Sequence, residues 1–569
     1  MAAGEEVAGR ATCDAARIAL DQLLPQQRSF FESLMPRRGE DVESQADPMV
    51  VRDESQPASK EGVGRHCIYQ IKHGSLLFRR GAPDAAKEQP RASYSGCSEL
   101  SSPRSDLDGK ACADAASRAM PSLQPMPCVD PSQPDGAAAV LAGARAPHAF
   151  AIRRLGLAEE AEMWTGSMLA AELDGVPCHV LSAPPASQRF TYYWGGGSDV
   201  LHSHYEEPTR VKSIGMTYDG FRAAAGAESG GAASALYLQT GLMQRSPSGE
   251  LEGKPLPGKS FPALLSRLRV AADYHHDDAA AGEAAAVAAA ADGGGDDTMR
   301  ARRLGAIRTV QSVLREGRMG HYARTSFFAS RPGAVTSLHF DHYDNLYMQL
   351  RGRKRFVLFA PLQAAHLYPF PLHHPLDQRS RIDLDAVAAA ASPSVSASFP
   401  RLREARGFEI DLGPGDLLFI PHHWWHYVET THADDAVDGL SLSLNLWFDF
   451  KPRLSSPQLP LSPGLHLELA RHVEAWLGSV IGETSLPEFL SCCAVELAAG
   501  RDRGDAAAVA AADAATHGRL SQHWLVARNL LLCELATSWI GWKGLRQFFD
   551  ELLFPERFRG LRPVSRVGG

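Results

Sequence analysis

The sequence lacks several features that mark common classes of protein. It has no run of about 18 apolar residues, so no membrane span is predicted. Its nine cysteines show no C-x-x-C spacing, which favours a reduced protein over a disulfide framework or a zinc site. The net charge is −8, so no broad basic field indicates a nucleic-acid partner. Acids near the N-terminus argue against a signal or transit peptide, and we expect a cytoplasmic or nuclear location.

Composition predicts how the chain is organised. A segment rich in Arg, Ser, Asp, Gly and Pro follows a short amphipathic pattern, and it cannot bury enough apolar surface to offset its ordering entropy. We predict five segments: an N-terminal helix at 1–35, a disordered stretch at 36–117, a strand-rich domain at 118–460 with a low-complexity insert at 279–297, a helical pair at 461–500 and a helical extension at 501–569.

The strand-rich domain is densest in its second half. Short β-forming segments, punctuated by Gly and Pro, predict a β-sandwich or barrel. The predicted strands are Thr325–Ala329, Val335–Asp341, Leu346–Leu350, Lys354–Phe359, Asp416–Ile420, Trp425–Glu429 and Ser441–Phe448. Helical patterns follow at Gly464–Val480, Leu486–Ala499 and Gln522–Leu553.

One motif in this region indicates a metal site. Side chains alternate along a strand, so His339 and Asp341 of H-F-D point the same way. A second histidine, His426, follows a G-P-G-D turn and a strand, in W-W-H. Two imidazoles and one carboxylate form the facial triad of non-haem Fe(II) oxygenases. The ordered combination is far more specific than H-x-D alone.

The sequence resembles a known family at these motifs and beyond them. Similarity continues through L-Y-P-F-P-L-H-H-P at 367–375, the G-P-G-D turn, W-W-H and N-L-W at 445–447, within roughly residues 118–500. The chain resembles the JmjC branch of the cupin-fold 2-oxoglutarate dioxygenases and, within it, the asparaginyl hydroxylases. The resemblance implies a mainly β, cupin-like double-stranded β-helix (jelly roll) with flanking and C-terminal α-helices. It also implies Fe(II), the co-substrate 2-oxoglutarate and O₂.

Lys354 is the predicted anchor for 2-oxoglutarate. It begins a strand after the turn at 351–353, and a buried ammonium without a partner would be costly. Ser441–Phe448 alternates polar and apolar residues, so one polar face should look into the barrel. The resemblance implies further residues around the co-substrate: hydroxyl donors Tyr237 and Thr336, amides Asn345 and Asn445, and Trp447 as a wall beside the iron.

For the substrate, the resemblance implies a peptide in extended conformation. The residues expected to contact it are Tyr192, Tyr193, Gln239, Gln378 and Arg379. Gln378 and Arg379 stand in the order opposite to that of the family. Because arginine offers only donors, this exchange predicts a preference shifted from asparagine toward an acceptor side chain such as aspartate.

Other histidine pairs are interpreted as solvated or structural and not as ligands of the catalytic metal. They are His275–His276, His373–His374 and His422–His423. The favoured function is hydroxylation of an Asn, Asp or His side chain in a protein, and the alternatives are a lysine demethylase, an RNA hydroxylase and a non-enzymatic scaffold. The resemblance also implies a homodimer formed through the C-terminal helices.

Overall fold

The structure, a computed structural model, describes part of the chain: residues 121–145, 148–153, 164–173, 175–184, 187–190, 211–227, 235–245, 251–253, 287, 297–385, 398–450, 459–498 and 522–561. The predicted N-terminal helix and the predicted disordered stretch lie outside the described residues. So do Tyr192, Tyr193 and His275–His276, and the low-complexity insert except for its residues 287 and 297.

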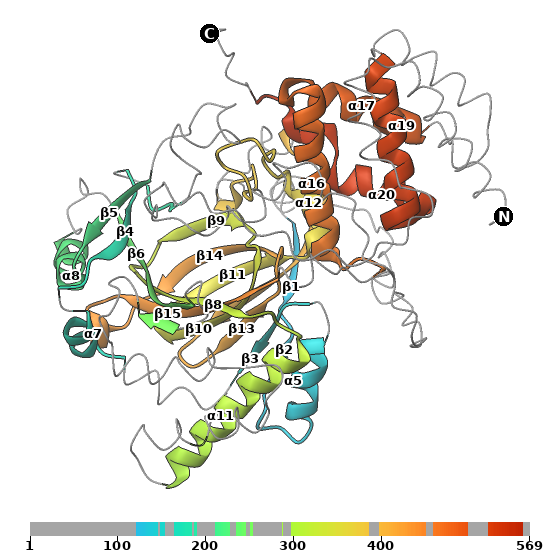
Figure 1. The fold of residues 1–569 in the computed structure, drawn as a ribbon. Coiled ribbons are helices and arrows are strands. Elements are labelled where there is room, and N and C mark those ends of the chain that lie inside the picture. The colour runs from blue at the N-terminus through green and yellow to red at the C-terminus, as the bar shows by residue number, and fades with distance from the viewer. Residues whose placement is uncertain are drawn as a thin grey trace, which may run out of the picture.

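Two β-sheets form the centre of the molecule (Figure 1). The five-stranded sheet has the order β1 (Ser122–Pro125), β12 (Arg406–Leu412), β11 (Arg353–Phe359), β14 (Trp425–His432) and β9 (Val335–His339). The ten-stranded sheet has the order β2 (Cys128–Val129), β3 (Phe150–Ile152), β13 (Leu417–Ile420), β10 (Tyr343–Arg351), β15 (Ser441–Asp449), β8 (Tyr322–Ser330), β6 (Leu236–Arg245), β4 (Cys178–Ser182) and β5 (Lys212–Met216), with β7 (Leu251–Gly253) beside β6. The predicted mainly β architecture is confirmed.

Most pairs of neighbouring strands are antiparallel, and the seven strands predicted between 325 and 448 are all present. Strand β12 was not predicted. Phe356 and Leu358 of one sheet share a buried cluster with Phe328 and Leu418 of the other, so the core lies between the two sheets. Any polar side chain on these inner faces is therefore removed from water and needs a partner.

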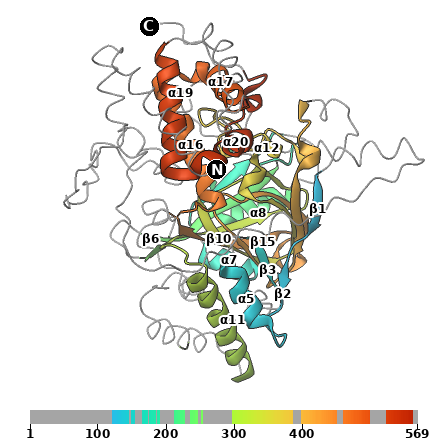
Figure 2. The same cartoon turned by 90° about the vertical axis from the view of Figure 1, so that its right-hand side faces the viewer.

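Helices flank the sheets and gather at the C-terminus (Figures 1 and 2). The flanking helices are α5 (Gly136–Arg145), α7 (Gly166–Glu172), α8 (Tyr218–Ala227), α11 (Asp297–Glu316) and α12 (Ala364–Leu367). The C-terminal helices are α16 (Pro463–Ile481), α17 (Leu486–Ala498), α19 (Gln522–Glu534) and α20 (Gly541–Leu552). Short turns complete the set: η4 (Pro361–Gln363), η5 (Leu402–Glu404), η6 (Asp435–Val437), η7 (Glu483–Ser485), the π-helical η9 (Leu535–Ile540) and η10 (Pro555–Phe558).

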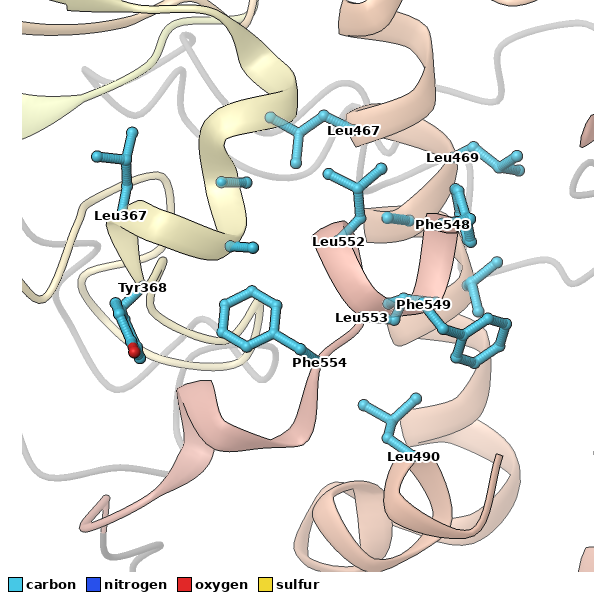
Figure 3. Packing of buried hydrophobic residues seen from close by; sticks show 14 of the residues in the cluster. Leu367, Tyr368, Leu467, Leu469, Leu490, Phe548, Phe549, Leu552, Leu553 and Phe554 are labelled. Atoms are coloured by element: carbon cyan, nitrogen blue, oxygen red, sulfur yellow. The ribbon is translucent and has the colours of Figure 1, made fainter. Parts of the chain in front are cut away.

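The last predicted helix is interrupted. One continuous helix was expected over Gln522–Leu553, whereas the structure has α19, a π-helical turn and α20. Gly541 marks the break with a φ of 73°, a conformation that favours glycine. Because of this break, α20 folds back, and its Phe549 and Leu552 join one buried cluster with Leu467 and Leu490 of α16 and α17 (Figure 3).

Two other expectations can be compared with the structure. No helix in the described part of the chain is both long and apolar enough to cross a membrane. Cys533 is disulfide-bonded, so the prediction of a fully reduced chain is wrong at this position.

Candidate active site

The three predicted metal ligands meet at the edge of the five-stranded sheet. Strands β9 and β14 are antiparallel, and their register sets His339 directly opposite His426, with ring centroids 4.1 Å apart. Asp341 follows the end of β9. Its Oδ1 lies 3.9 Å from His339 Nε2, and its Oδ2 lies 3.5 Å from His426 Nε2. The three side chains therefore converge as a His₂Asp group that could hold a metal ion.

Backbone carbonyls orient both imidazoles. His339 Nδ1 donates to the carbonyl of Ser337 at 2.8 Å, and His426 Nδ1 donates to that of Trp424 at 3.0 Å. With the proton on Nδ1, each ring presents the lone pair of Nε2 to the carboxylate side. Such bonds fix the tautomer and the ring orientation of metal-binding histidines.

Electrostatics keeps the group in the form that binds a cation. Burial, followed by the charges of His426 and Arg379, lowers the pKa of His339 well below its usual value, so this ring is neutral. Burial raises the pKa of Asp341, but the surrounding His426, His339 and Arg379 outweigh it, and the net pKa is lowered. The carboxylate is therefore ionised, and two imidazole nitrogens with one carboxylate form a ligand set that suits a divalent metal.

A β-bulge brings Thr336 to the same face as the triad. His339 pairs with His426, but the next pair joins Thr336 to Val428, so two residues of β9 between these pairs oppose one of β14. Cross-strand partners share a face, and regular alternation would have turned Thr336 away. The predicted position of Thr336 is therefore consistent with the structure, although a contact of its hydroxyl with Lys354 is not observed among the described residues.

Lys354 is buried without an acidic partner. It is 1% exposed, and among the described residues no carboxylate forms an ion pair with it. Its ammonium donates to Tyr347 Oη at 3.0 Å, to Ser443 Oγ at 3.1 Å and to Tyr237 Oη at 3.5 Å. It also lies 5.3 Å from the ring centroid of Tyr237 and 5.6 Å from that of Phe328. Burial lowers its pKa to about 7. This cation fits the distal carboxylate of a dicarboxylic acid.

Lys354 and the triad face the same interior. On β11, Lys354 pairs with Thr430 and Leu358 pairs with His426. Residues 354 and 358 lie on one face because their spacing is even, and cross-strand partners share that face. A molecule anchored on the ammonium can therefore extend along the inside of the barrel toward the metal ligands.

The predicted amides and tryptophan lie on the facing sheet. Asn345 pairs with Trp447 across β10 and β15, and Asn445 lies two residues away on the same face. Asn445 Oδ1 accepts the backbone N–H of Ser326 at 3.3 Å. The guanidinium of Arg324 lies 3.9 Å from the ring centroid of Trp447. The structure thus groups these three predicted residues and adds an unpredicted cation.

Tyr347 and Ser443 were not assigned to the site from the sequence. Both contact Lys354, and their hydroxyls lie 2.5 Å apart. Their positions could have been found, because Tyr347 follows Asn345 by two residues and Ser443 precedes Asn445 by two. Arg324 had no comparable signal, since its contact with Trp447 depends on the pairing of β8 with β15.

Of the two residues in exchanged order, Gln378 and Arg379, the structure places Arg379 beside the triad. Arg379 forms an isolated antiparallel bridge with His339, and its charge lowers the pKa of both His339 and Asp341, so it lies beside the triad. Gln378 has a φ of 68° and donates its backbone N–H to Asp377 Oδ1 at 2.7 Å. This left-handed residue breaks the regular alternation of a strand, so the order of Gln378 and Arg379 does not by itself decide which way each side chain faces.

The remaining predicted substrate residues are placed in part. Gln239 is half-buried on β6, two residues from Tyr237 and opposite Phe328, on an inner strand face. Tyr192 and Tyr193 lie outside the described residues.

Comparisons with known proteins agree with this geometry at the level of the fold. Residues 260–453 match the family described as "Cupin-like domain". HSPB1-associated protein 1 of Bos taurus is 38% identical over 120 residues, which cover 21% of this chain and 22% of that protein. Lysine-specific demethylase JMJ31 of Arabidopsis thaliana is 29% identical over 135 residues, covering 23% and 22%. tRNA wybutosine-synthesizing protein 5 of Danio rerio is 40% identical over 100 residues, covering 18% and 27%.

These matches span roughly a fifth to a quarter of each relative's length. The names of the relatives also indicate different substrates, lysine for one and tRNA for another. The comparisons therefore support a cupin-like domain and do not single out the asparaginyl hydroxylases.

Proposed function

We propose that this chain, which carries a cupin-like domain, is an Fe(II)- and 2-oxoglutarate-dependent oxygenase that hydroxylates a protein side chain, with Asn, Asp or His as the target. One observation carries the proposal. A His₂Asp group and a buried lysine, for which the described part of the chain offers no acidic partner, share the interior of one barrel. A metal ion and a dicarboxylic acid together would satisfy both.

The residues present fit both groups. His339, Asp341 and His426 would hold the metal, with both Nε2 atoms and one ionised carboxylate available. Lys354 would hold the distal carboxylate, assisted by the hydroxyl of Tyr347. When bound, Fe(II), 2-oxoglutarate and O₂ supply the oxidation that adds one oxygen to a C–H bond and releases succinate and CO₂.

The chain's own residues orient the metal-binding imidazoles and keep water away from the ammonium of Lys354. The hydrogen bonds from His339 and His426 to backbone carbonyls hold the rings in place before a metal arrives, which reduces the cost of reorganisation. The aromatic rings around Lys354 exclude water from its ammonium and so strengthen its attraction to an anion.

Arg379 is the residue we assign to substrate choice. It lies beside His339, and its guanidinium offers donors but no acceptor. A target side chain with an acceptor oxygen, aspartate before asparagine, would be oriented by these donors. This assignment rests on Arg379 alone, because Gln378 does not share its strand geometry.

A peptide assay tests the proposal. The purified chain is incubated with Fe(II), 2-oxoglutarate and matched extended peptides that carry Asp, Asn, His or methyl-lysine, and products are mapped by mass spectrometry. We expect gain of one oxygen on Asp and, more weakly, on Asn. The chain with His339→Ala is the control.

Loss of methyl groups from lysine would instead support a demethylase, and modification of RNA with no peptide turnover would refute the protein substrate. Efficient turnover of Asn peptides without Asp turnover would refute the role given to Arg379. The homodimer through the C-terminal helices remains a prediction, and light scattering coupled to gel filtration measures it.

A further inference from the structure

A second group of metal-binding side chains lies behind the active site. His423 Nε2 is 2.9 Å from Glu468 Oε2 and 3.2 Å from His342 Nδ1, and His342 Nδ1 is 3.4 Å from the same carboxylate oxygen. His342 begins the turn before β10, His423 lies in the loop before β14, and Glu468 comes from α16. Three elements distant in the sequence thus direct one ligand atom each at a single point.

All three side chains are buried. His342 is 6% exposed, His423 is 0% and Glu468 is 2%. Burial raises the pKa of Glu468, but the two histidines outweigh it, and the net pKa lies well below its usual value. The group therefore contains an ionised carboxylate that has been removed from water, which is costly without a cation.

The two imidazole nitrogens that face Glu468 do not both donate to it. Each nitrogen of a neutral imidazole either donates or accepts. If both near nitrogens donate to Glu468, two N–H groups face each other across 3.2 Å. The far nitrogens, His342 Nε2 and His423 Nδ1, have no hydrogen-bond partner among the described residues. Each ring can therefore carry its proton on the far nitrogen and present a lone pair to the common point.

Two other basic side chains of α16 lie near the carboxylate of Glu468. Arg471 Nε lies 3.7 Å from Glu468 Oε2, but its two terminal nitrogens bind Asp377 at 2.5 and 2.8 Å. The bidentate pair holds the two terminal nitrogens, and only Nε of the guanidinium faces Glu468. His472, one turn along α16, donates Nδ1 to the backbone carbonyl of Glu468 and lies 3.5 Å from Glu468 Oε1, the oxygen on the other side from the ligand atom. It is not one of the three grouped side chains.

The backbone of His423 is held in an uncommon conformation. Its φ is 64°, the left-handed region that residues other than glycine seldom adopt. Such conformations persist only where the surroundings impose them, and they concentrate at functional sites. Here the conformation directs the ring at Glu468, while the N–H of His423 donates to the carbonyl of Asp341 at 2.8 Å.

We propose that His342, His423 and Glu468 bind a divalent metal ion, Zn²⁺, at a structural site separate from the His₂Asp triad. In a tetrahedral zinc site with bonds near 2.0–2.1 Å, ligand atoms lie roughly 3.3 Å apart. The three distances of 2.9, 3.2 and 3.4 Å match that spacing. Nitrogen and carboxylate ligands suit zinc.

The ion would position the catalytic residues. His342 is the neighbour of Asp341, and His423 precedes His426 by three residues. Joining both to Glu468 of α16 fixes the two segments that carry triad ligands against one helix. This site does not depend on the reaction that the barrel performs, so failure of the hydroxylase proposal would leave it standing.

Metal counting tests the site. The triad is first removed with His339→Ala and His426→Ala, the protein is stripped of metal and loaded with Zn²⁺ alone, and bound zinc is measured after gel filtration. We expect about one Zn²⁺ per chain in this variant and two in the wild type. Adding Glu468→Gln should remove the remaining ion, whereas adding His472→Gln, the matched control on α16, should not.

A second measurement does not depend on whether the Glu468→Gln variant folds. Zinc that binds the native state and not the unfolded chain raises the melting temperature, so Zn²⁺ should stabilise the variant that lacks the triad. X-ray absorption of the bound ion should show an imidazole-containing shell at about 2.0–2.1 Å. A variant without the triad that retains no zinc and melts at an unchanged temperature would overturn the proposal.

Discussion

Replacing Lys354 with methionine should stabilise the ligand-free protein while abolishing its response to 2-oxoglutarate. Burial lowers the pKa of Lys354 from 10.5 to about 7. This shift means that the charged lysine lowers the free energy of unfolding by about 5 kcal/mol relative to its neutral form. Because the folded pKa is the lower one, the unfolded chain binds the additional proton between pH 7 and 10.5. The destabilisation is therefore complete below pH 7 and is relieved as the pH rises through that window.

Methionine removes the charge and is one heavy atom shorter than lysine. It also loses the hydrogen bonds to Tyr347 and Ser443. Each is worth about 1 kcal/mol, so we expect a net gain of about 2–4 kcal/mol at pH 6.5. The same change removes the charge partner of 2-oxoglutarate. A lost buried partner costs about 3–5 kcal/mol, and the Kd should rise by roughly two to three orders of magnitude.

Thermal unfolding measures both effects in one series. Wild-type and Lys354→Met proteins are melted with and without 2-oxoglutarate at pH values from 6.5 to 9.5. The wild type should gain stability from the ligand, and the variant should not. Above pH 7, binding requires the lysine to take up a proton, so the wild-type Kd should rise by up to about tenfold per pH unit.

Arg355→Met is the matched control. Arg355 is the next residue of β11, lies on the opposite face and pairs with Glu409 and Glu429 at the surface. Its replacement should leave the response to 2-oxoglutarate intact. The reasoning would be refuted if Lys354→Met were less stable than the wild type at pH 6.5 and still responded to the ligand.

Other substitutions test the remaining parts of the site. His339→Ala or His426→Ala should abolish Fe(II) binding and the slow release of succinate without substrate, since two ligands do not hold the metal; full turnover in either would contradict the triad. Arg471→Met should destabilise the fold by about 3–5 kcal/mol in chemical denaturation by removing the bidentate cationic partner of the buried Asp377 carboxylate, and adding Asp377→Leu should recover much of the loss. Arg379→Gln should shift peptide turnover from Asp toward Asn, and an unchanged ratio would exclude this arginine from substrate choice.

Regular alternation explains what could be predicted from the sequence. Evenly spaced residues of one strand share a face, so the amino-acid order alone groups His339 with Asp341, and Asn445 with Trp447. Lys354 was placed by its position at the start of a strand. The shared faces follow from local geometry, whereas the roles of Lys354, Asn445 and Trp447 were expected from the family resemblance.

Three features could not be predicted because they break that regularity or depend on distant segments. The bulge that turns Thr336 toward the triad inserts one residue into β9. Gln378 and His423 adopt left-handed backbones, which an isolated sequence does not indicate for residues other than glycine. The group around Glu468 requires α16 to pack behind the barrel, and no local pattern encodes that contact.

The end of the chain is connected to the loop that carries Arg379. Arg381 donates to the backbone carbonyls of Arg557 at 2.6 Å and Arg559 at 2.8 Å. Arg557 in turn pairs with Glu474, which accepts the N–H of Leu372 at 2.9 Å. Figure 3 shows Phe554 directed at Tyr368 of the same loop, and their rings meet edge to face.

This connection has a consequence for proteolysis and for cooperative unfolding. Cleavage before α20 would remove the carbonyls that hold Arg381 and would expose the carboxylate of Glu474. A fragment ending near residue 500 would therefore keep every metal ligand and lose the support of its substrate loop. In native-state hydrogen exchange, residues 368–381 and 553–559 should open together, with one protection free energy for both.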